Sequence, residues 1–406
     1  MKIIKLEEIK YALQNLRQRK MRSFLSILSI LIGIAAVFAL VSFGMGIKNY
    51  VDTLAEESGT NKLLIQAKGI GAPGTDDTFA LTQEDVDFIE KINGIDEISG
   101  MYYKISEVTF RDKNKYAYMM GLNIDKIDFI MQGMNIDMEK GRELRKGDTY
   151  KVVLGYNYML DNKVFSKGLQ IGDKILIDGA KFEVVGFYSA VGNPSDDSQV
   201  YITSEIFEQI YPEKKNKYSM IMASTEQGLK TKTVADRVSE RLRKYKGQEE
   251  GKEDFYVQTF EDAIATFSTI INIINGVLVL IAMVSVVVAS VNIMNTMYTS
   301  VLERTKEIGV MKAVGARNSD IMFIFLLESG AIGLIGGIIG VMLGYLVATT
   351  GGSYAAAAGF SALKPIFPLT LILGCILFAF IVGAGSGLLP AIRASKLRPV
   401  DSLRYE

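Results

Sequence analysis

The stretch FLSILSILIGIAAVFALVSFGMGI, from Phe24 to Ile47, contains no charged residue. A helix needs about 20 apolar residues to cross a hydrocarbon core about 30 Å thick, so this stretch is long enough to span a membrane. The alternative is a cleaved signal peptide, whose apolar core is about 7 to 15 residues long and precedes a small-residue cleavage site. The length of the stretch favours a membrane-spanning helix.

Three more apolar windows follow along the chain, at residues 270–298, 322–348 and 369–389. Only one charged residue, Glu328, falls inside them. Each window is long enough for a helix that crosses the bilayer. The sequence therefore predicts an α-helical integral membrane protein with four transmembrane helices.

The lysines and arginines near these windows predict the orientation of the chain. Seven lie in the basic amphipathic segment 1–23, four in the loop 299–321 and four in the tail 390–406, whereas the short loop 349–368 contains one. Positively charged flanks remain in the cytoplasm. We therefore expect a multi-pass protein of the cell membrane, with both termini and the loop 299–321 cytoplasmic and residues 48–269 outside.

Residues 48–269 have the pattern of a folded α+β domain. One helix is predicted to begin after Thr82, with Asp85 as its capping partner, and another in KTKTVADRVSERLRKYKG. From Lys48 to Asp262 there are 37 acidic and 29 basic residues, so no basic surface suited to nucleic acid stands out. Alternating apolar and polar residues predict strands in KLLIQA, EISGMYYKISEVTF, KYAYMMGL, KVVLG and DKILIDGAKFEVVGFY.

The apolar pattern continues beyond two of the windows. The helix of the second span is predicted from about Thr259 to about Arg304, and that of the first span extends to Leu54. At about 1.5 Å per residue, the second helix is more than twice as long as the hydrocarbon core is thick. Two helices would thus connect the outer domain with the membrane; fraying at the membrane surface is the alternative.

The composition excludes several kinds of chemistry. The chain has no histidine and a single cysteine, Cys375, so it has no internal disulfide and no Cys/His zinc site or histidine-dependent catalysis. No G-x-x-x-x-G-K-[ST] phosphate-binding motif occurs in the sequence. We therefore expect a non-catalytic protein without cofactor or metal, in which Cys375 is a packing residue.

Three separated motifs resemble the permease subunits of MacB-type ABC transporters, a group that includes the lipoprotein-releasing permeases and, more distantly, FtsX. They are the start LRQRKMRSFLSILSILIGIAAVFALVSFG with GTNKLLIQ, the loop RTKEIGVMKAVGARNSDIMFIFLLES and the ending LPAIRASKLRPVDSLRYE. The resemblance covers almost the whole chain. It implies a permease whose outer domain is moved by ATP hydrolysis in a separate cytoplasmic ATPase subunit. It also implies two permease copies, identical or related, and leaves open whether an extracytoplasmic adaptor takes part.

The resemblance places a coupling helix for the ATPase in the loop 299–321. Spacing by three and four residues predicts an apolar stripe of Ile308, Met311 and Val314 or Gly315. Beside it lies a polar rim of Arg304, Glu307, Lys312 and Arg317, which suits a partner groove. Glycines in the loop permit a turn or close backbone approach. A solvated loop that only carries positive charge is the alternative. The expected ATPase-coupling residues are Glu303, Arg304, Glu307, Ile308, Gly309, Met311, Val314 and Gly315.

Glu328 lies near the start of the third window, where a carboxylate is costly. We expect it to pair with Arg304, Lys306 or Lys312, and an ion or proton pathway is the alternative. Glycines four residues apart predict tight helix packing in the last two spans. These are Gly333 and Gly337, Gly340 and Gly344 with Gly336, and Gly383 and Gly387.

Two other functions remain open on the sequence alone. A membrane regulator of the FtsX kind would activate an extracellular cell-wall enzyme instead of moving a substrate. A secondary transporter is disfavoured because ionisable groups and broken helices are nearly absent at mid-membrane. No cluster in the outer domain identifies a substrate such as a peptide, a lipoprotein or a drug.

Overall fold

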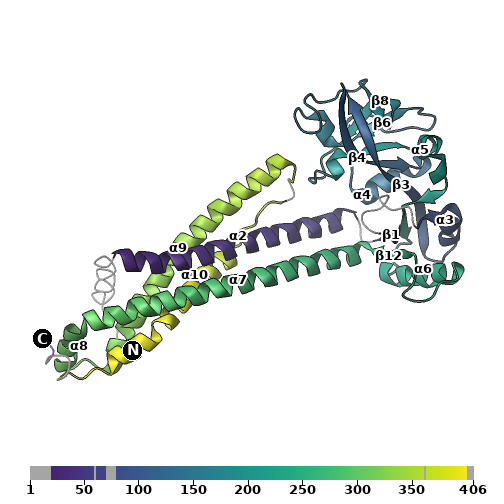
Figure 1. Cartoon of the computed structure of the whole chain (residues 1–406). Coiled ribbons are helices and arrows are strands. Elements are labelled where there is room, and N and C mark those ends of the chain that lie inside the picture. Colours follow the sequence, from purple (N-terminus) through teal and green to yellow (C-terminus); the bar gives the residue numbers. More distant parts are fainter. Residues whose placement is uncertain (1–19, 59–60, 70–78, 361–362, 400–406) are drawn as a thin grey trace. The chain divides into compact units, whose positions relative to one another are not determined.

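The computed structural model describes residues 20–58, 61–69, 79–360 and 363–399. Most of the predicted basic segment 1–23 and the end of the tail therefore lie outside the described residues. The chain divides into two compact units (Figure 1). The helical unit contains Met1–Ile47, Ile270–Tyr354 and Leu363–Glu406, and the sheet unit contains Lys48–Thr269 and Ala355–Ala362.

Four helices are long and apolar enough to cross a membrane, which confirms the predicted number of spans. They are α2 (Lys20–Ser58), α7 (Phe260–Glu303), α9 (Asn318–Ala358) and α10 (Leu369–Ser386). The bounds of α7 agree with the expected helix from about Thr259 to about Arg304. Two shorter helices, α8 (Thr305–Ala313) and α11 (Leu388–Ser395), follow α7 and α10.

Helix α9 is longer than its apolar window. The predicted span ends at Ala348 and a loop is predicted from residue 349, but the helix continues to Ala358. It ends where Gly359 adopts a φ of 108°, with its N–H bonded to the carbonyl of Ala356 and the N–H of Phe360 bonded to that of Ala355. This is a Schellman ending, and because glycine carries no Cβ it enters the left-handed conformation at little cost.

Glycines place the backbone of α9 against two neighbouring helices. A Cβ at Gly333 would meet the carbonyl oxygen of Ala379 and lie 3.0 Å from Cα of Gly383, both on α10. On a second face, a Cβ at Gly340 would lie 3.0 Å from Cβ of Ile34 on α2. Gly337 faces α10 in the same way, and Gly336 and Gly344 face α2. The predicted glycine pattern thus corresponds to two close helix contacts, which small residues permit in a membrane.

Gly383 on α10 and Gly387 at its C-terminal cap lie against Ser329 of α9. A Cβ at Gly383 would lie 2.6 Å from the carbonyl oxygen of Ser329, and one at Gly387 would meet the Ser329 hydroxyl. Ser329 itself is fully buried. The two helices therefore pack with the glycines of one next to the glycines and serine of the other.

The sheet unit is an α+β fold, as predicted. Its helices are α3 (Gln83–Glu90), α4 (Ile127–Met134), α5 (Ser204–Ile210) and α6 (Thr231–Tyr245). Its strands are β1 (Lys62–Ala67), β2 (Leu81–Thr82), β3 (Ile95–Phe110), β4 (Lys113–Leu122), β5 (Met138–Gly141), β6 (Lys151–Leu154), β7 (Lys174–Ile177), β8 (Ala180–Tyr188), β9 (Val200–Thr203), β10 (Lys217–Tyr218), β11 (Met220–Thr225) and β12 (Phe255–Thr259). All five sequence stretches predicted as strands contain strands.

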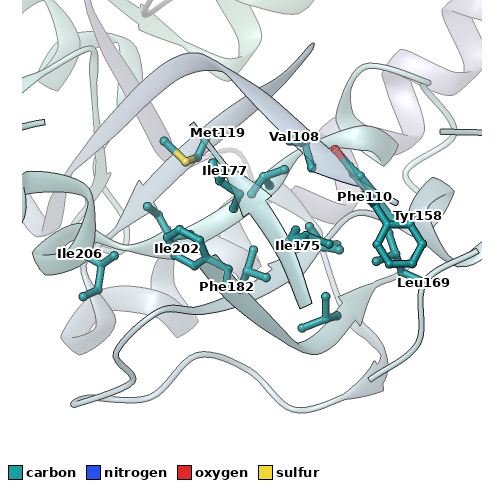
Figure 2. Packing of buried hydrophobic residues seen from close by; sticks show 14 of the residues in the cluster. Val108, Phe110, Met119, Tyr158, Leu169, Ile175, Ile177, Phe182, Ile202 and Ile206 are labelled. Atoms are coloured by element: carbon teal, nitrogen blue, oxygen red, sulfur yellow. The ribbon is translucent and has the colours of Figure 1, made fainter. Parts of the chain in front are cut away.

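Six strands close into a ring. Neighbouring pairs run in the order β3, β4, β9, β6, β8 and β7, and β7 returns to β3 through Val108↔Ile177. The interior is filled by alternating side chains such as Ile175, Ile177 and Phe182, all buried (Figure 2). A closed ring leaves no free strand edge, so this half of the unit forms a barrel with its own core.

The other half of the unit begins where β3 leaves the barrel. The first part of β3 pairs with β11, and the sheet continues through β1 to β12. Helices α3 and α6 cover a core with these strands. The predicted start of α3 is confirmed, because Thr82 and Asp85 form a capping box. Strands β1 and β12 pair with Leu63 opposite Thr259, so the strand that follows α2 lies next to the strand that precedes α7.

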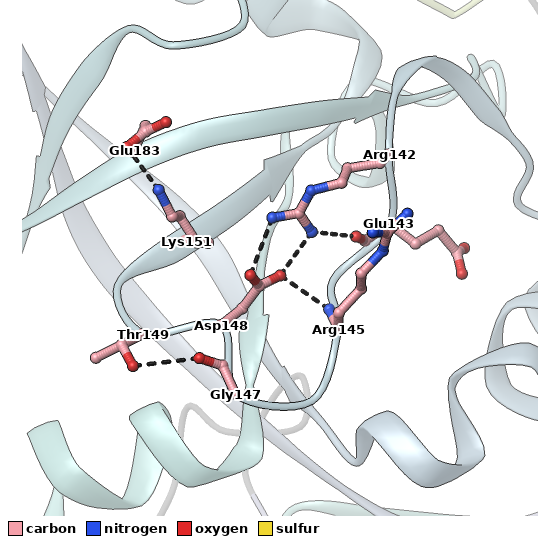
Figure 3. A network of polar contacts seen from close by, with 8 residues as sticks. All are labelled: Arg142, Glu143, Arg145, Gly147, Asp148, Thr149, Lys151 and Glu183. Atoms are coloured by element: carbon pink, nitrogen blue, oxygen red, sulfur yellow. Dashed lines mark hydrogen bonds and ion pairs between the residues drawn. The ribbon is translucent and has the colours of Figure 1, made fainter.

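A polar network braces the loop between β5 and β6 (Figure 3). The Arg142 guanidinium donates to both carboxylate oxygens of Asp148, at 2.7 and 2.9 Å, and the Arg145 N–H donates to the same carboxylate at 2.9 Å. The hydrogen bond from Arg142 lowers the pKa of the Asp148 carboxyl below its ordinary value. The Asp148 carboxylate thus fixes the conformation of this loop through hydrogen bonds to Arg142 and Arg145.

Candidate functional site

The loop between α7 and α9 forms a single short helix, α8. Arg304 separates it from α7 with a non-helical backbone conformation. At its other end the N–H of Gly315 bonds to the carbonyl of Lys312, the N–H of Ala316 bonds to that of Met311, and Gly315 has a φ of 105°. A second Schellman ending therefore turns the chain into α9. The role expected of Gly315, a turn, matches its backbone conformation.

The apolar residues of α8 point in two directions. Ile308 is fully buried in the core of the helical unit, and Met311 packs against the same core. Val310 and Val314 are exposed, at 52% and 86% of their surface. The expectation that Ile308 and Met311 form a stripe for a partner is therefore corrected, because their side chains hold α8 onto its own chain. The surface available to a partner contains Val310 and Val314.

A buried ion pair connects the start of α8 with α9. Arg304 Nη1 lies 3.1 Å from Glu328 Oε2, and both residues are less than a tenth exposed. Arg304 Nε also donates to Glu307 at 3.0 Å, and its guanidinium lies over the ring of Phe325. Breaking such a pair leaves an uncompensated buried charge, so the contact specifies how α8 meets α9. Of the three cations considered for Glu328 from the sequence, the structure selects Arg304.

The Lys312 side chain of α8 points toward the C-terminal segment of the same chain. Its ammonium group donates to the carbonyl oxygens of Ser395 at 2.6 Å and Leu397 at 2.7 Å, where α11 ends. Lys312 is expected on the polar rim for a partner, but it lies against the chain's own C-terminal segment. Sequence reasoning missed this contact because a backbone carbonyl acceptor leaves no residue-type signal.

The remaining expected coupling residues differ in their exposure. Gly309 is buried beside Ile308, whereas Glu303, Glu307 and Arg317 are exposed. The site therefore consists of the exposed Val310 on α8 and the exposed Val314 at its C-terminal cap, surrounded by exposed charged residues. Arg304 and Lys312 attach α8 to the rest of the chain. Such a surface is suited to binding a protein.

Comparison with known proteins agrees with this architecture. A family model described as the MacB-like periplasmic core domain matches residues 23–241, and one described as the FtsX-like permease C-terminal region matches residues 279–399. The chain is 32% identical to an uncharacterized ABC transporter permease of Methanocaldococcus jannaschii over 98% of both chains, and 25% identical to one of Bacillus subtilis over 99% of both. It is 31% identical to the macrolide export ATP-binding/permease protein of Chlorobium phaeobacteroides, over 97% of this chain and 60% of that protein.

Four spanning helices, an α+β domain between the first two and a short helix between the second and third define a polytopic permease. The chain belongs to the MacB/FtsX family of ABC transporter permeases. It is a non-catalytic subunit like its full-length relatives, and an ABC permease implies an ATPase partner. The resemblance inferred from the sequence is thereby confirmed.

Proposed function

We propose that this permease couples ATP hydrolysis by a separate cytoplasmic ATPase to movement of its extracytoplasmic sheet unit, for export or extraction of a substrate such as a peptide, a lipoprotein or a drug. The ATPase binds the α8 loop on the cytoplasmic side, where both termini also lie. Two permease copies with two ATPase subunits form the working assembly. The match of residues 23–241 to the MacB-like core domain supports this function over regulation of a cell-wall enzyme.

The exposure of Val310 and Val314 is the observation that carries the proposal. They lie four residues apart, on one face of a helix that the positive-inside rule places in the cytoplasm and not in lipid. Exposed apolar side chains with a charged surround are typical of a protein interface with an apolar centre. The buried anchors Ile308 and Arg304 hold this face in position before any partner binds.

The variant Val314→Asp tests the proposed contact. Because Val314 is 86% exposed, the change leaves the packing of the chain intact, but it places a desolvated charge in the interface, which typically costs several kcal/mol. We expect the co-purified ATPase subunit to decrease strongly, with normal membrane insertion of the permease. The variant Met311→Asp is less informative, since Met311 also packs within the chain.

Two control variants make the result specific. Val314→Ala removes little apolar surface and introduces no charge, so the ATPase should still co-purify. Leu229→Asp makes the same kind of change at an exposed apolar residue of the sheet unit and should leave ATPase binding unchanged. Full co-purification with Val314→Asp would show that α8 does not bind the ATPase.

A further inference from the structure

Lys312 joins two cytoplasmic elements that are far apart in the sequence. The residues whose carbonyl oxygens it contacts, Ser395 and Leu397, lie 83 and 85 positions further along the chain. Both distances, 2.6 and 2.7 Å, are typical of charge-assisted hydrogen bonds. The contact therefore defines where the end of α11 lies against α8.

The position of the ammonium group matches the chemistry of a helix end. The last carbonyls of a helix have no partner within the helix and carry partial negative charge, so a lysine near them is favourable. Ser395 is the last residue of α11, and Leu397 follows it by two positions. Lys312 thus satisfies one acceptor of a different helix and one acceptor just after it, and a side chain of similar length without donors, such as methionine, cannot do so.

Other contacts hold α11 on its remaining side. The guanidinium of Arg393 lies 4.8 Å from the centre of the Tyr298 ring on α7, and Ala391 and Ala394 are fully buried in the core of the helical unit. The start of α8 is connected to α9 through Arg304 and Glu328. Lys312 provides a polar link between the end of α8 and the segment after α11.

We propose that Lys312 is a positioning residue for energy coupling: it makes α8 and the C-terminal segment after α11 one body, so that a partner bound to α8 moves both. This inference rests on the proposed ATPase contact at α8. Lys396, which follows α11 directly, is exposed.

The experiment compares three variants of the full chain in a Cys375→Ala background. Lys312→Met keeps the length of the side chain and removes its donors, Lys312→Arg keeps donors, and Lys306→Met changes an exposed lysine of the same helix. Spin labels are attached to Ala313→Cys on α8 and Lys396→Cys after α11, both exposed positions. The distance distribution between them is measured by pulsed electron paramagnetic resonance in the permease alone, in nanodiscs.

We expect a narrow distribution for the wild-type lysine, Lys306→Met and Lys312→Arg, and a broad one for Lys312→Met. In unlabelled complexes with the ATPase subunit, Lys312→Met should retain binding but lose the stimulation of ATP hydrolysis by the permease, and Lys312→Arg should restore it. An unchanged distribution for Lys312→Met would overturn the inference, as would a broad distribution without loss of stimulation. Absence of ATPase binding to the wild-type chain would instead refute the proposed function, because the distance measurement does not require the ATPase.

Discussion

At the scale of single residues, charged side chains in this protein specify contacts that apolar packing leaves open. Arg304, Lys312 and Asp148 each bind groups from a different part of the chain or from a turn. Hydrogen bonds to charged groups stabilise a fold by about 1.5 to 3 kcal/mol each, and removal of one partner costs the desolvation of the other. Their main contribution is therefore to select one arrangement among several that bury similar apolar surface.

Asp148 provides a test of this role through pH. Its pKa is lowered in the folded protein, chiefly by the hydrogen bond from Arg142, so it stabilises the fold above the ordinary carboxyl pKa of about 3.9. That stabilisation is lost as the pH falls through the lower folded pKa. We expect Asp148→Asn to destabilise the sheet unit by about 1.5 to 3 kcal/mol at pH 7, and the difference from wild type to vanish in strong acid. Thermal unfolding of the purified chain at several pH values measures it.

The control for this prediction is Asp125→Asn. Asp125 pairs with Lys146 at 3.0 Å, but both side chains are about two-thirds exposed or more, and such pairs contribute about 0 to 1 kcal/mol. Its effect should be small at every pH. A loss of stability for Asp148→Asn that is equal at neutral and acidic pH would contradict an electrostatic role for this carboxylate.

At the scale of elements, α9 contacts two neighbouring helices through its glycines. Its glycine faces contact α10 and α2, so a single methyl group at Gly333 meets the Ala379 carbonyl oxygen. We expect Gly333→Ala to destabilise the helical unit by about 1 to 3 kcal/mol, as overpacking does. The thermal stability of the chain in detergent, compared with wild type, measures this effect.

Gly374→Ala is the matched control on α10. No described atom lies within 4 Å of a Cβ built there, and alanine favours a helix over glycine by about 1 kcal/mol. Stability should be unchanged or slightly higher. If both alanine variants behave alike, the glycines of α9 are not packing residues.

The elements that could be predicted from the sequence are those determined by local pattern. The four spans, α3 with its capping box and the strands β1, β3, β4, β6, β7 and β8 follow from periodicity and cap residues within each segment. The extension of α9 to Ala358 was missed because the hydropathy window ended at Ala348, although Gly359 marks the true stop. Helix α11 was not predicted because the fourth apolar window ends at residue 389, directly before Pro390, whereas α11 accommodates that proline near its start.

The candidate site was less predictable, since burial depends on contacts between distant segments. Spacing alone put Ile308 and Val314 on one stripe, yet the first is buried and the second is exposed. The pairing of Glu328 with a cation could be expected, because a carboxylate in a span requires a partner. The carbonyl partners of Lys312 could not, because every residue presents a carbonyl oxygen.

At the scale of the whole molecule, the positive-inside rule predicts the side of the membrane on which each loop lies. Cysteines at Lys115 and Lys364 in a Cys375→Ala background should react with an impermeant thiol reagent in intact cells, and a cysteine at Lys306 should react only after permeabilisation. All three lysines are exposed, so burial does not limit labelling. Labelling of Lys306→Cys in intact cells would reverse the assigned orientation.

The pairing of β1 with β12 determines how the sheet unit responds to force. Helix α2 ends at Ser58 shortly before β1 begins at Lys62, and β12 ends at Thr259 directly before α7. If both helices move in the same direction, the two strands move together and no force separates them. Separation of the two helices acts on the pair at Leu63 and Thr259, the end of the ladder to which both helices are joined, and loads its hydrogen bonds one after another.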